Sequence, residues 1–325
     1  MHRFRRLPNL TRFVLSLGLS LAGVLLCAPS AKANIVIVPT FDSSITGDAN
    51  ALLIETTINQ ALNFYETNIT TPITVHITYA EMGSGLGQSD TFFDTVSYSQ
   101  YLSALQAHSS GNAVDTSALG TLPAGPNDPV DGTTNVDVTT ANLRALGFSA
   151  SAATDSTISV NTAITNYAGK PFNGGFYSLL AVIEHETDEA LGLGSNLDTG
   201  SNTGSIRPED LFRYSAPGTR SYTIDSGATS YFSVDGGVTN LAGFNQTGPP
   251  GGADYGDWAS SGTPRVQDAF GTPGAFPVFG PEQAALDAIG YNFASLDTPE
   301  PSSWLLMLGG IGFFARRRFF TRAGR

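Results

Sequence analysis

The segment 176–192 reads FYSLLAVIEHETDEALG, and it passes abruptly from an apolar run into a cluster of charged side chains. The run up to Ile183 is apolar on nearly every side of a helix, which predicts a buried helix rather than an amphipathic surface helix. Charged residues begin at Glu184. Gly192 is expected to end the helix, because glycine tolerates left-handed backbone geometry.

His185 and Glu189 stand one helical turn apart in this charged part. At about 100° per residue, a step of four residues returns a side chain to within roughly 40° of its first direction. Both side chains can therefore face one point, as two metal ligands must. Glu186 lies beside the first ligand, where a zinc protease keeps its general base. The second ligand is Glu where the usual motif has His.

The charge balance also favours a cation at this helix. Burying an unpaired carboxylate costs several kcal/mol unless it is paired or bound to a metal. Ten of the 16 Lys+Arg lie in residues 1–33 and 299–325, whereas 27 of the 28 Asp+Glu lie between them, so residues 34–298 carry a formal net charge of −21. The alternative is that residues 184–189 form the solvated end of a helix.

The same acidic balance excludes nucleic-acid binding as a function. It favours a solubilising surface, cation binding, or both. Residues 34–298 suffice for one large domain or for two modest lobes with cores of their own.

The N-terminus has the pattern of a secretory signal peptide over residues 1–33. Four arginines precede an apolar run from Phe13 to Leu26, and a small-x-small site ends at Ala33. Cleavage is expected between Ala33 and Asn34. The only cysteine, Cys27, lies inside this segment, so the exported chain is expected to have neither disulfides nor cysteine ligands.

The C-terminus, residues 299–325, begins with Pro299-Glu300-Pro301, continues with an apolar run from Trp304 to Ala315, and ends in arginines. The run would form roughly 18 Å of helix, which is short for a hydrocarbon core of about 30 Å. This tripartite tail closely resembles the PEP-CTERM sorting signal of Gram-negative bacteria. The alternatives are a short tail anchor or a buried terminal helix.

That resemblance implies export across the inner membrane and transient membrane insertion through a short transmembrane segment in the tail. It further implies processing by an exosortase. The expected destination is the cell surface, the extracellular matrix or the medium.

Hydrophobic periodicity and turn residues between the two ends predict a series of short elements. We expect strands at 35–38, 72–79 and 156–162, helices at 48–66, 99–107, 139–146 and 282–289, a long loop at 111–133, and short elements at 210–214, 221–224 and 231–234. This order is typical of the α+β class with a cleft below the sheet. An N-lobe of about 34–194 and a C-lobe of about 195–298 are predicted.

The stretch His185-Glu186-x-x-Glu189-x-x-Gly192 resembles the metzincin-style motif of secreted bacterial zincin-like metalloproteases. The phrases DLFRYS at 210–215, YFSVDGG at 231–237 and LDAIGY at 286–291 extend this likeness over most of 34–292. The resemblance implies a zincin-like fold, with a twisted mixed sheet, a buried active-site helix and an irregular C-terminal lobe. It implies hydrolysis of peptide bonds in a protein or peptide substrate by metal-activated water.

The resemblance also assigns roles to single residues. His185, Glu189 and Asp198 are expected to hold Zn²⁺, and Glu186 is expected to take a proton from the attacking water. Ca²⁺ or another divalent ion is the alternative, because oxygen ligands suit harder ions. Asp198 enters this set because Ser195 stands where the third His of the motif would be.

Two departures leave a second function open. One His and two carboxylates would cancel the charge of a divalent ion and weaken its polarising effect. The segment 266–270, VQDAF, stands where the family's methionine turn is expected, and it contains no methionine. The alternative function is a catalytically inactive zincin-fold protein that binds at the surface or in the extracellular matrix. His76 and His108 are interpreted as ordinary strand and helix-end histidines, with His76 as a weaker candidate ligand.

Overall fold

A computed structural model of the chain describes residues 34–199, 204–248, 253–260 and 262–294. These residues belong to one compact unit that begins at Asn34. The predicted signal peptide and the predicted sorting tail lie outside the described residues, and so does the short transmembrane segment expected in the tail. Among the residues that are described, no helix combines the length and the hydropathy needed to cross a membrane.

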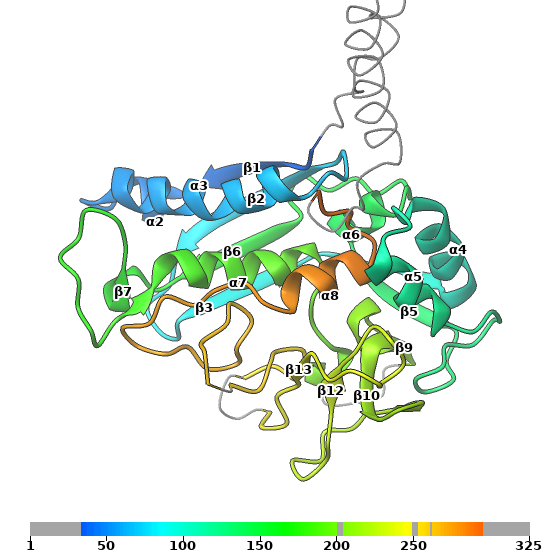
Figure 1. The fold of residues 1–325 in the computed structure, drawn as a ribbon. Helices are drawn as coiled ribbons and strands as arrows, with labels where there is room; N and C mark the ends of the chain where they lie inside the picture. The colour runs from blue at the N-terminus through cyan, green and yellow to red at the C-terminus, as the bar shows by residue number, and fades with distance from the viewer. Residues whose placement is uncertain (1–33, 200–203, 249–252, 261, 295–325) are drawn as a thin grey trace, which may run out of the picture. The chain divides into compact units, whose positions relative to one another are not determined.

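A mixed four-stranded sheet forms the centre of this unit (Figure 1). Its strands, in spatial order, are β1 (Val36–Phe41), β2 (Thr74–Glu81), β6 (Ser156–Val160) and β3 (Gly87–Thr91). The first three strands are parallel, and β3 runs antiparallel to β6 at the edge of the sheet. In β2, Val75, Ile77 and Tyr79 are buried, which confirms the alternating strand predicted there.

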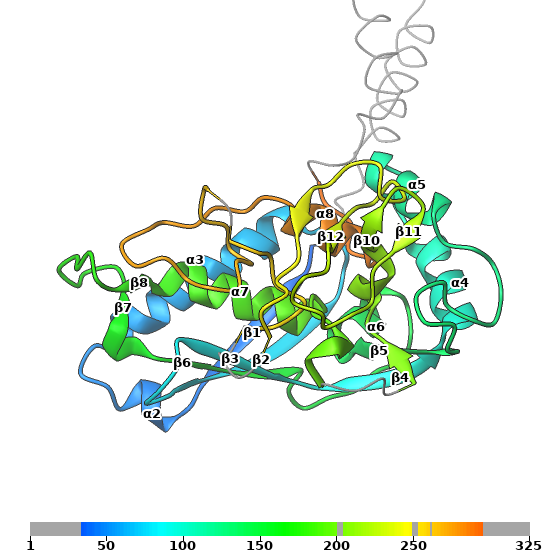
Figure 2. The ribbon, with the colours of Figure 1, turned by 90° about the horizontal axis from the view of Figure 1, so that it is seen from below.

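Two long helices lie side by side on one face of this sheet (Figures 1 and 2). They are α3 (Ala51–Asn68) and α7 (Leu179–Leu191). The predicted apolar stripe of α3 is confirmed, because Ile54, Ile58, Ala61, Leu62 and Tyr65 are all buried.

The start of α7 differs from the prediction. Tyr177 and Ser178 form the short strand β8, which pairs with β7 (Thr165–Asn166), instead of the first turn of the helix. The Ser178 hydroxyl then accepts a hydrogen bond from the Ala181 amide and caps the helix. Most residues of α7 are buried, as expected from the apolar run.

The remaining helices are shorter. They are α2 (Ser43–Thr46), α4 (Tyr98–His108), α5 (Ala113–Gly120), α6 (Thr140–Ala145) and α8 (Glu282–Ala288), with 3₁₀ turns η1 (Thr162–Ile164), η2 (Asn196–Thr199) and η3 (Pro208–Phe212). The expectation of a loop throughout 111–133 is wrong. The Asn112 side chain caps α5 by accepting from the Asp115 amide, and the first proline of the segment, Pro123, comes only after that helix has ended.

The described residues also form three smaller sheets, one of which is the β7–β8 pair. A three-stranded sheet joins β4 (Phe93–Ser97), β5 (Asn135–Thr139) and β9 (Ser205–Ile206), and a four-stranded sheet joins β11 (Thr219–Arg220), β10 (Arg213–Ala216), β12 (Tyr231–Phe232) and β13 (Ala242–Gly243). The element predicted at 221–224 is irregular, because the chain leaves β11 at Arg220. Strands β10, β12 and β13 lie on the side of α7 away from α3 (Figure 1). Later in the chain, Phe279 stacks on Phe64 of α3, with ring centroids 3.6 Å apart.

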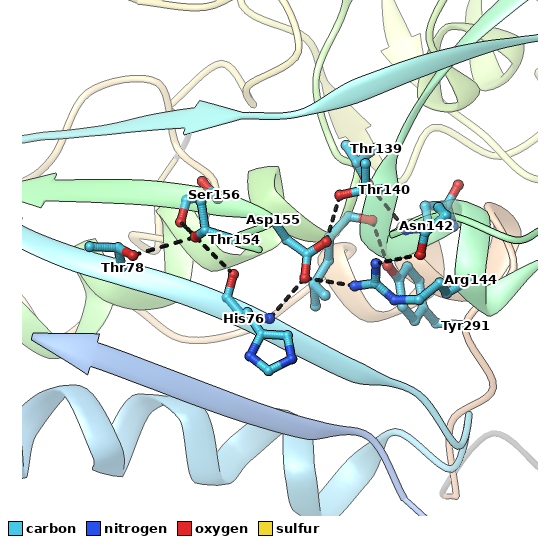
Figure 3. A network of polar contacts seen from close by, with 12 residues as sticks. His76, Thr78, Thr139, Thr140, Asn142, Arg144, Thr154, Asp155, Ser156 and Tyr291 are labelled. Atoms are coloured by element: carbon cyan, nitrogen blue, oxygen red, sulfur yellow. Dashed lines mark hydrogen bonds and ion pairs between the residues drawn. The ribbon is translucent and has the colours of Figure 1, made fainter. Parts of the chain in front are cut away.

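An ion pair between buried Asp155 and half-buried Arg144 joins the sheet to α6 (Figure 3). The Asp155 carboxylate is fully buried and accepts from Arg144 Nη2 at 2.6 Å, from Thr140 Oγ1 at 2.5 Å and from the His76 amide at 2.8 Å. The imidazole of His76 takes no part in this network, and its residue is exposed. We therefore interpret the network as structural.

Candidate metal centre

The charged end of α7 presents two different faces. His185, Glu186 and Glu189 line a cleft, whereas Glu184 and Asp188 face α3. There the Tyr65 hydroxyl hydrogen-bonds to the Glu184 carbonyl at 2.7 Å and to Asp188 Oδ1 at 2.8 Å. The helix ends at Gly192, whose φ of 129° is one that other residues rarely adopt.

His185 is oriented by a backbone carbonyl. Its Nδ1 lies 3.0 Å from the Val266 carbonyl oxygen, which can only accept, so Nδ1 carries the hydrogen of the neutral ring. Burial alone would lower the pKa of His185, but the carboxylates of Asp257 and Glu189, which face Nε2, raise it well above its usual value. Nε2 therefore also carries a hydrogen in the metal-free chain, and a bound cation would replace that hydrogen. Nε2 lies 3.6 Å from Glu189 Oε1 and 3.7 Å from Asp257 Oδ1. One ligand atom from each of the three residues lies within 4.8 Å of the others.

Asp257 joins this group because of close backbone packing at Gly256. A Cβ atom at Gly256 would lie only 2.8 Å from the Gly194 carbonyl carbon, so the two glycines let the segment approach the end of α7. The Asp257 carboxylate accepts a hydrogen bond of 2.9 Å from Gln267 Nε2. Burial raises the pKa of Asp257 to about 8, with Glu189 and Asp254 adding to the shift and His185 opposing it.

Asp198, the predicted third ligand, takes a different place. It lies in η2 and is not in the group formed by His185, Glu189 and Asp257. Its Oδ1 accepts from the Tyr255 amide at 2.5 Å. Ser195 likewise turns away, because its hydroxyl donates to Asp210 at 2.5 Å. The structure therefore brings His185 and Glu189 together as predicted, with Asp257 rather than Asp198 beside them.

Glu186 lies beside this group and is almost fully buried. Burial raises its pKa well above the usual value, and the adjacent Glu189 carboxylate raises it further. The pKa of Glu189 is shifted in the opposite direction. Burial alone would raise its pKa, but His185 and the Ser89 hydroxyl, which donates to Oε2 at 2.5 Å, bring it below the usual value. Two adjacent carboxyl groups on one helix thus have pKa values shifted in opposite directions.

The cleft has a volume of about 830 Å³ and is strongly acidic. Five carboxylate residues line it, whereas Arg265 is the one Lys or Arg among its described lining residues; the five are Glu186, Glu189, Asp254, Asp257 and Asp268. Strand β3 contributes Gly87, Gln88 and Ser89 to one wall, and residues 264–272 contribute to another. Its apolar lining includes Leu86, Val182 and Phe270.

Sequence reasoning missed Asp254, Asp257 and β3. The two aspartates lie in a segment dense in Gly and Pro, which has no periodicity from which to place a side chain. The sequence offered one indication of this part of the site, because the segment 266–270 was expected to lie beneath the metal. Val266 does contact His185 there.

Comparisons with known proteins bear on the C-terminal tail alone. Residues 297–318 match the PEP-CTERM protein-sorting motif. This confirms the sorting signal expected at Pro299-Glu300-Pro301, so the protein is exported, processed by an exosortase and directed to the cell surface of a Gram-negative bacterium. No curated protein and no solved structure matches the chain.

Proposed function

We propose that this exported protein is a surface-directed metal-dependent peptidase with a zincin-like fold, which hydrolyses peptide bonds in protein or peptide substrates. The observation that carries the proposal is the convergence of three ligand atoms, from His185, Glu189 and Asp257, within 4.8 Å of one another in a cleft. Glu186 beside them and the edge strand β3 along the cleft add support.

The geometry of the three side chains is compatible with a divalent cation. Bonds of about 2.0–2.2 Å in a tetrahedral zinc site separate ligand atoms by about 3.3–3.6 Å. The separations from His185 Nε2 are 3.6 Å to Glu189 and 3.7 Å to Asp257. Metal binding would release the Nε2 proton and so free the lone pair for the cation. One nitrogen and two oxygens suit Zn²⁺, and the oxygen-rich set also admits a harder ion such as Ca²⁺.

A bound divalent metal would supply Lewis acidity, which activates water and polarises a carbonyl group. In this proposal, Glu186 would accept the proton of the attacking water and return it to the leaving nitrogen. Burial raises the pKa of Glu186, which strengthens its carboxylate as a proton acceptor.

Substrate binding is assigned to β3. As the edge strand of the sheet, it offers backbone donors and acceptors to an extended peptide beside the cleft. The apolar side chains of Leu86, Val182 and Phe270 would receive an apolar side chain of the substrate. The five lining carboxylates disfavour acidic substrates.

The second candidate function is a catalytically inactive zincin-fold protein that binds at the surface or in the extracellular matrix. The ligand set favours it in one respect. Two carboxylates among three ligands cancel both charges of a divalent ion, which weakens its effect on water and carbonyl groups.

Glu186→Gln separates the two functions. The purified, Zn²⁺-loaded full-length protein is expected to cleave an unfolded protein such as casein. The variant should lose at least about 100-fold in rate, because a general base contributes that much or more, while it keeps its metal. Unchanged hydrolysis in Glu186→Gln, or none in the metal-loaded wild type, would contradict the peptidase assignment.

Metal binding is tested with a matched pair of aspartates. Asp257→Asn should lose most of the bound Zn²⁺ measured after dialysis, whereas Asp198→Asn should keep it. Equal retention by both variants would remove Asp257 from the ligand set. Absence of stoichiometric metal from the wild type after loading would remove the metal centre itself.

A further inference from the structure

The dipeptide Val266-Gln267 contacts two of the three proposed ligands. The Val266 carbonyl accepts from His185 Nδ1 at 3.0 Å. The Gln267 amide Nε2 donates to Asp257 Oδ1 at 2.9 Å. This Oδ1 is also the atom of Asp257 that faces His185 Nε2 at 3.7 Å. A carboxylate oxygen has two lone pairs, so it can accept from the amide and still present a lone pair to a cation.

Gln267 is itself held in place by its backbone. The residue is fully buried. Its backbone amide nitrogen donates to Glu282 Oε1 at 3.1 Å, and its backbone carbonyl oxygen accepts from the Trp258 backbone amide at 2.8 Å. Trp258 is also fully buried, and its ring lies 5.1 Å from that of Phe244 and 5.5 Å from that of Phe232. The side-chain amide therefore projects from a backbone with little freedom to move.

The chemistry at this position requires a donor. Asp257 lies among other carboxylates, so a hydrogen-bond donor opposes its rotation away from the site and offsets part of its negative charge. Methionine has a similar length but no donor, and glutamate would add another carboxylate. Among the side chains in contact with Asp257, Gln267 supplies a neutral donor without bringing in a competing cation.

We propose that Gln267 is a positioning residue that holds Asp257 as the third ligand of the metal centre. This inference rests on the proposed function, because it requires a metal at His185, Glu189 and Asp257. Partners that orient metal ligands in this way typically change metal affinity by about 10–100-fold when they are removed.

The test uses Co²⁺ and Zn²⁺ as probes with the purified full-length protein. Gln267→Met keeps the volume and removes the donor. It is expected to weaken metal affinity about 10–100-fold. It should also change the visible absorption of the Co²⁺ complex, because the geometry of one ligand changes.

Gln246→Met is the matched control, since the Gln246 amide donates to the Asn245 carbonyl and not to a carboxylate. This control should leave the affinity and the spectrum unchanged.

A second variant covers the case in which Gln267→Met does not fold, as judged by circular dichroism of the metal-free protein. Gln267→Glu keeps the shape and should weaken binding at least as much, because it replaces the donor by a carboxylate. Wild-type affinity and spectrum in a folded Gln267 variant would overturn this inference and leave the metal centre standing. A wild-type protein that binds neither probe would overturn the proposed function and this inference with it.

Discussion

Asp257 is buried and Asp198 is half-buried, and the two carboxylates meet different neighbours. Asp257 faces His185 and an amide donor, whereas Asp198 accepts from the Tyr255 backbone and lies near Asp254. Burial raises the pKa of Asp198 from 3.8 to about 7, and the charge of Asp254 adds to the shift. Because its carboxyl group holds its proton more tightly in the folded chain than in the unfolded one, Asp198 makes stability depend on pH.

The direction of this dependence follows from proton binding. Between about pH 4 and about pH 7, the folded chain binds more protons at Asp198 than the unfolded chain does, so the contribution of this group to stability falls as pH rises. Asp198→Asn keeps an acceptor for the Tyr255 amide and cannot ionise. The free energy of unfolding of the variant should therefore exceed that of the wild type by a growing amount as pH rises through this window. The upper limit of this difference is about 4 kcal/mol, because one pKa unit corresponds to about 1.36 kcal/mol.

Urea unfolding of the metal-free proteins at several pH values measures this difference. Asp225→Asn is the control, because it removes the same charge from an exposed position where Asn can still accept from the Gly227 amide. A difference between Asp198→Asn and the wild type that stays constant from about pH 4 to about pH 8 would show that Asp198 does not titrate as described.

At the scale of elements, β3 and α7 meet at Gly87. A Cβ atom there would lie 2.7 Å from Val182 Cγ1 and closer still to the Glu186 carboxylate. Gly87→Ala must therefore displace Val182 and Glu186 or push β3 outward. We expect a loss of about 1–3 kcal/mol in the free energy of unfolding, as in other overpacked sites. Hydrolysis of casein should fall as well, because Glu186 moves.

Gly83→Ala is the matched control for that substitution. Gly83 lies in the turn between β2 and β3, and a Cβ atom there meets nothing within 4 Å. Its free energy of unfolding should stay within about 0.5 kcal/mol of the wild type. If urea unfolding gave the same free energy of unfolding for Gly83→Ala and Gly87→Ala, this result would show that β3 and α7 are not in close contact at Gly87.

The predictability of these elements follows from their hydrophobic patterns. The stripe of α3, the alternation of β2 and the apolar run of α7 were all visible in the sequence, because each buries one face or nearly the whole surface. Strand β3 reads GQSDT and has no apolar face, so nothing in its composition distinguished it from a loop. Its place is set by pairing with β6, a contact between distant segments.

The candidate site was predictable only where it lies on one helix. His185, Glu186 and Glu189 follow from helical spacing, which is local. Asp257 reaches the same point through the tertiary contact of Gly256 with Gly194, in a segment with little regular structure. A motif read along the chain therefore predicted the third ligand at Asp198, the nearest carboxylate after the helix. It could not detect the Asp257 carboxylate, which tertiary packing brings to the candidate site.

At the scale of the whole chain, regular and irregular parts have different tasks. The sheet and the helices α3 and α7 position His185 and Glu189. The irregular segments 253–260 and 262–270 supply Asp257, the Gln267 amide that donates to it and the Val266 carbonyl that accepts from His185. A cation bound at the proposed site would link the irregular segment to α7, in addition to the backbone packing and hydrogen bonds that already join them.

We expect sorting of the protein to the cell surface to depend on the PEP-CTERM motif. Residues 297–318 match the PEP-CTERM motif, and an exosortase is expected to cleave there. In the native bacterium, replacing Pro299-Glu300-Pro301 by three alanines should block cleavage. The uncut apolar run and its terminal arginines would then hold the chain in the inner membrane. Intact mass spectrometry of the surface and membrane fractions distinguishes cut from uncut chains.

Replacing Ser302 and Ser303 by alanine leaves the Pro-Glu-Pro triplet intact and should leave cleavage unchanged. Recovery of the triple-alanine variant at the surface with the wild-type mass would show that cleavage does not depend on these three residues.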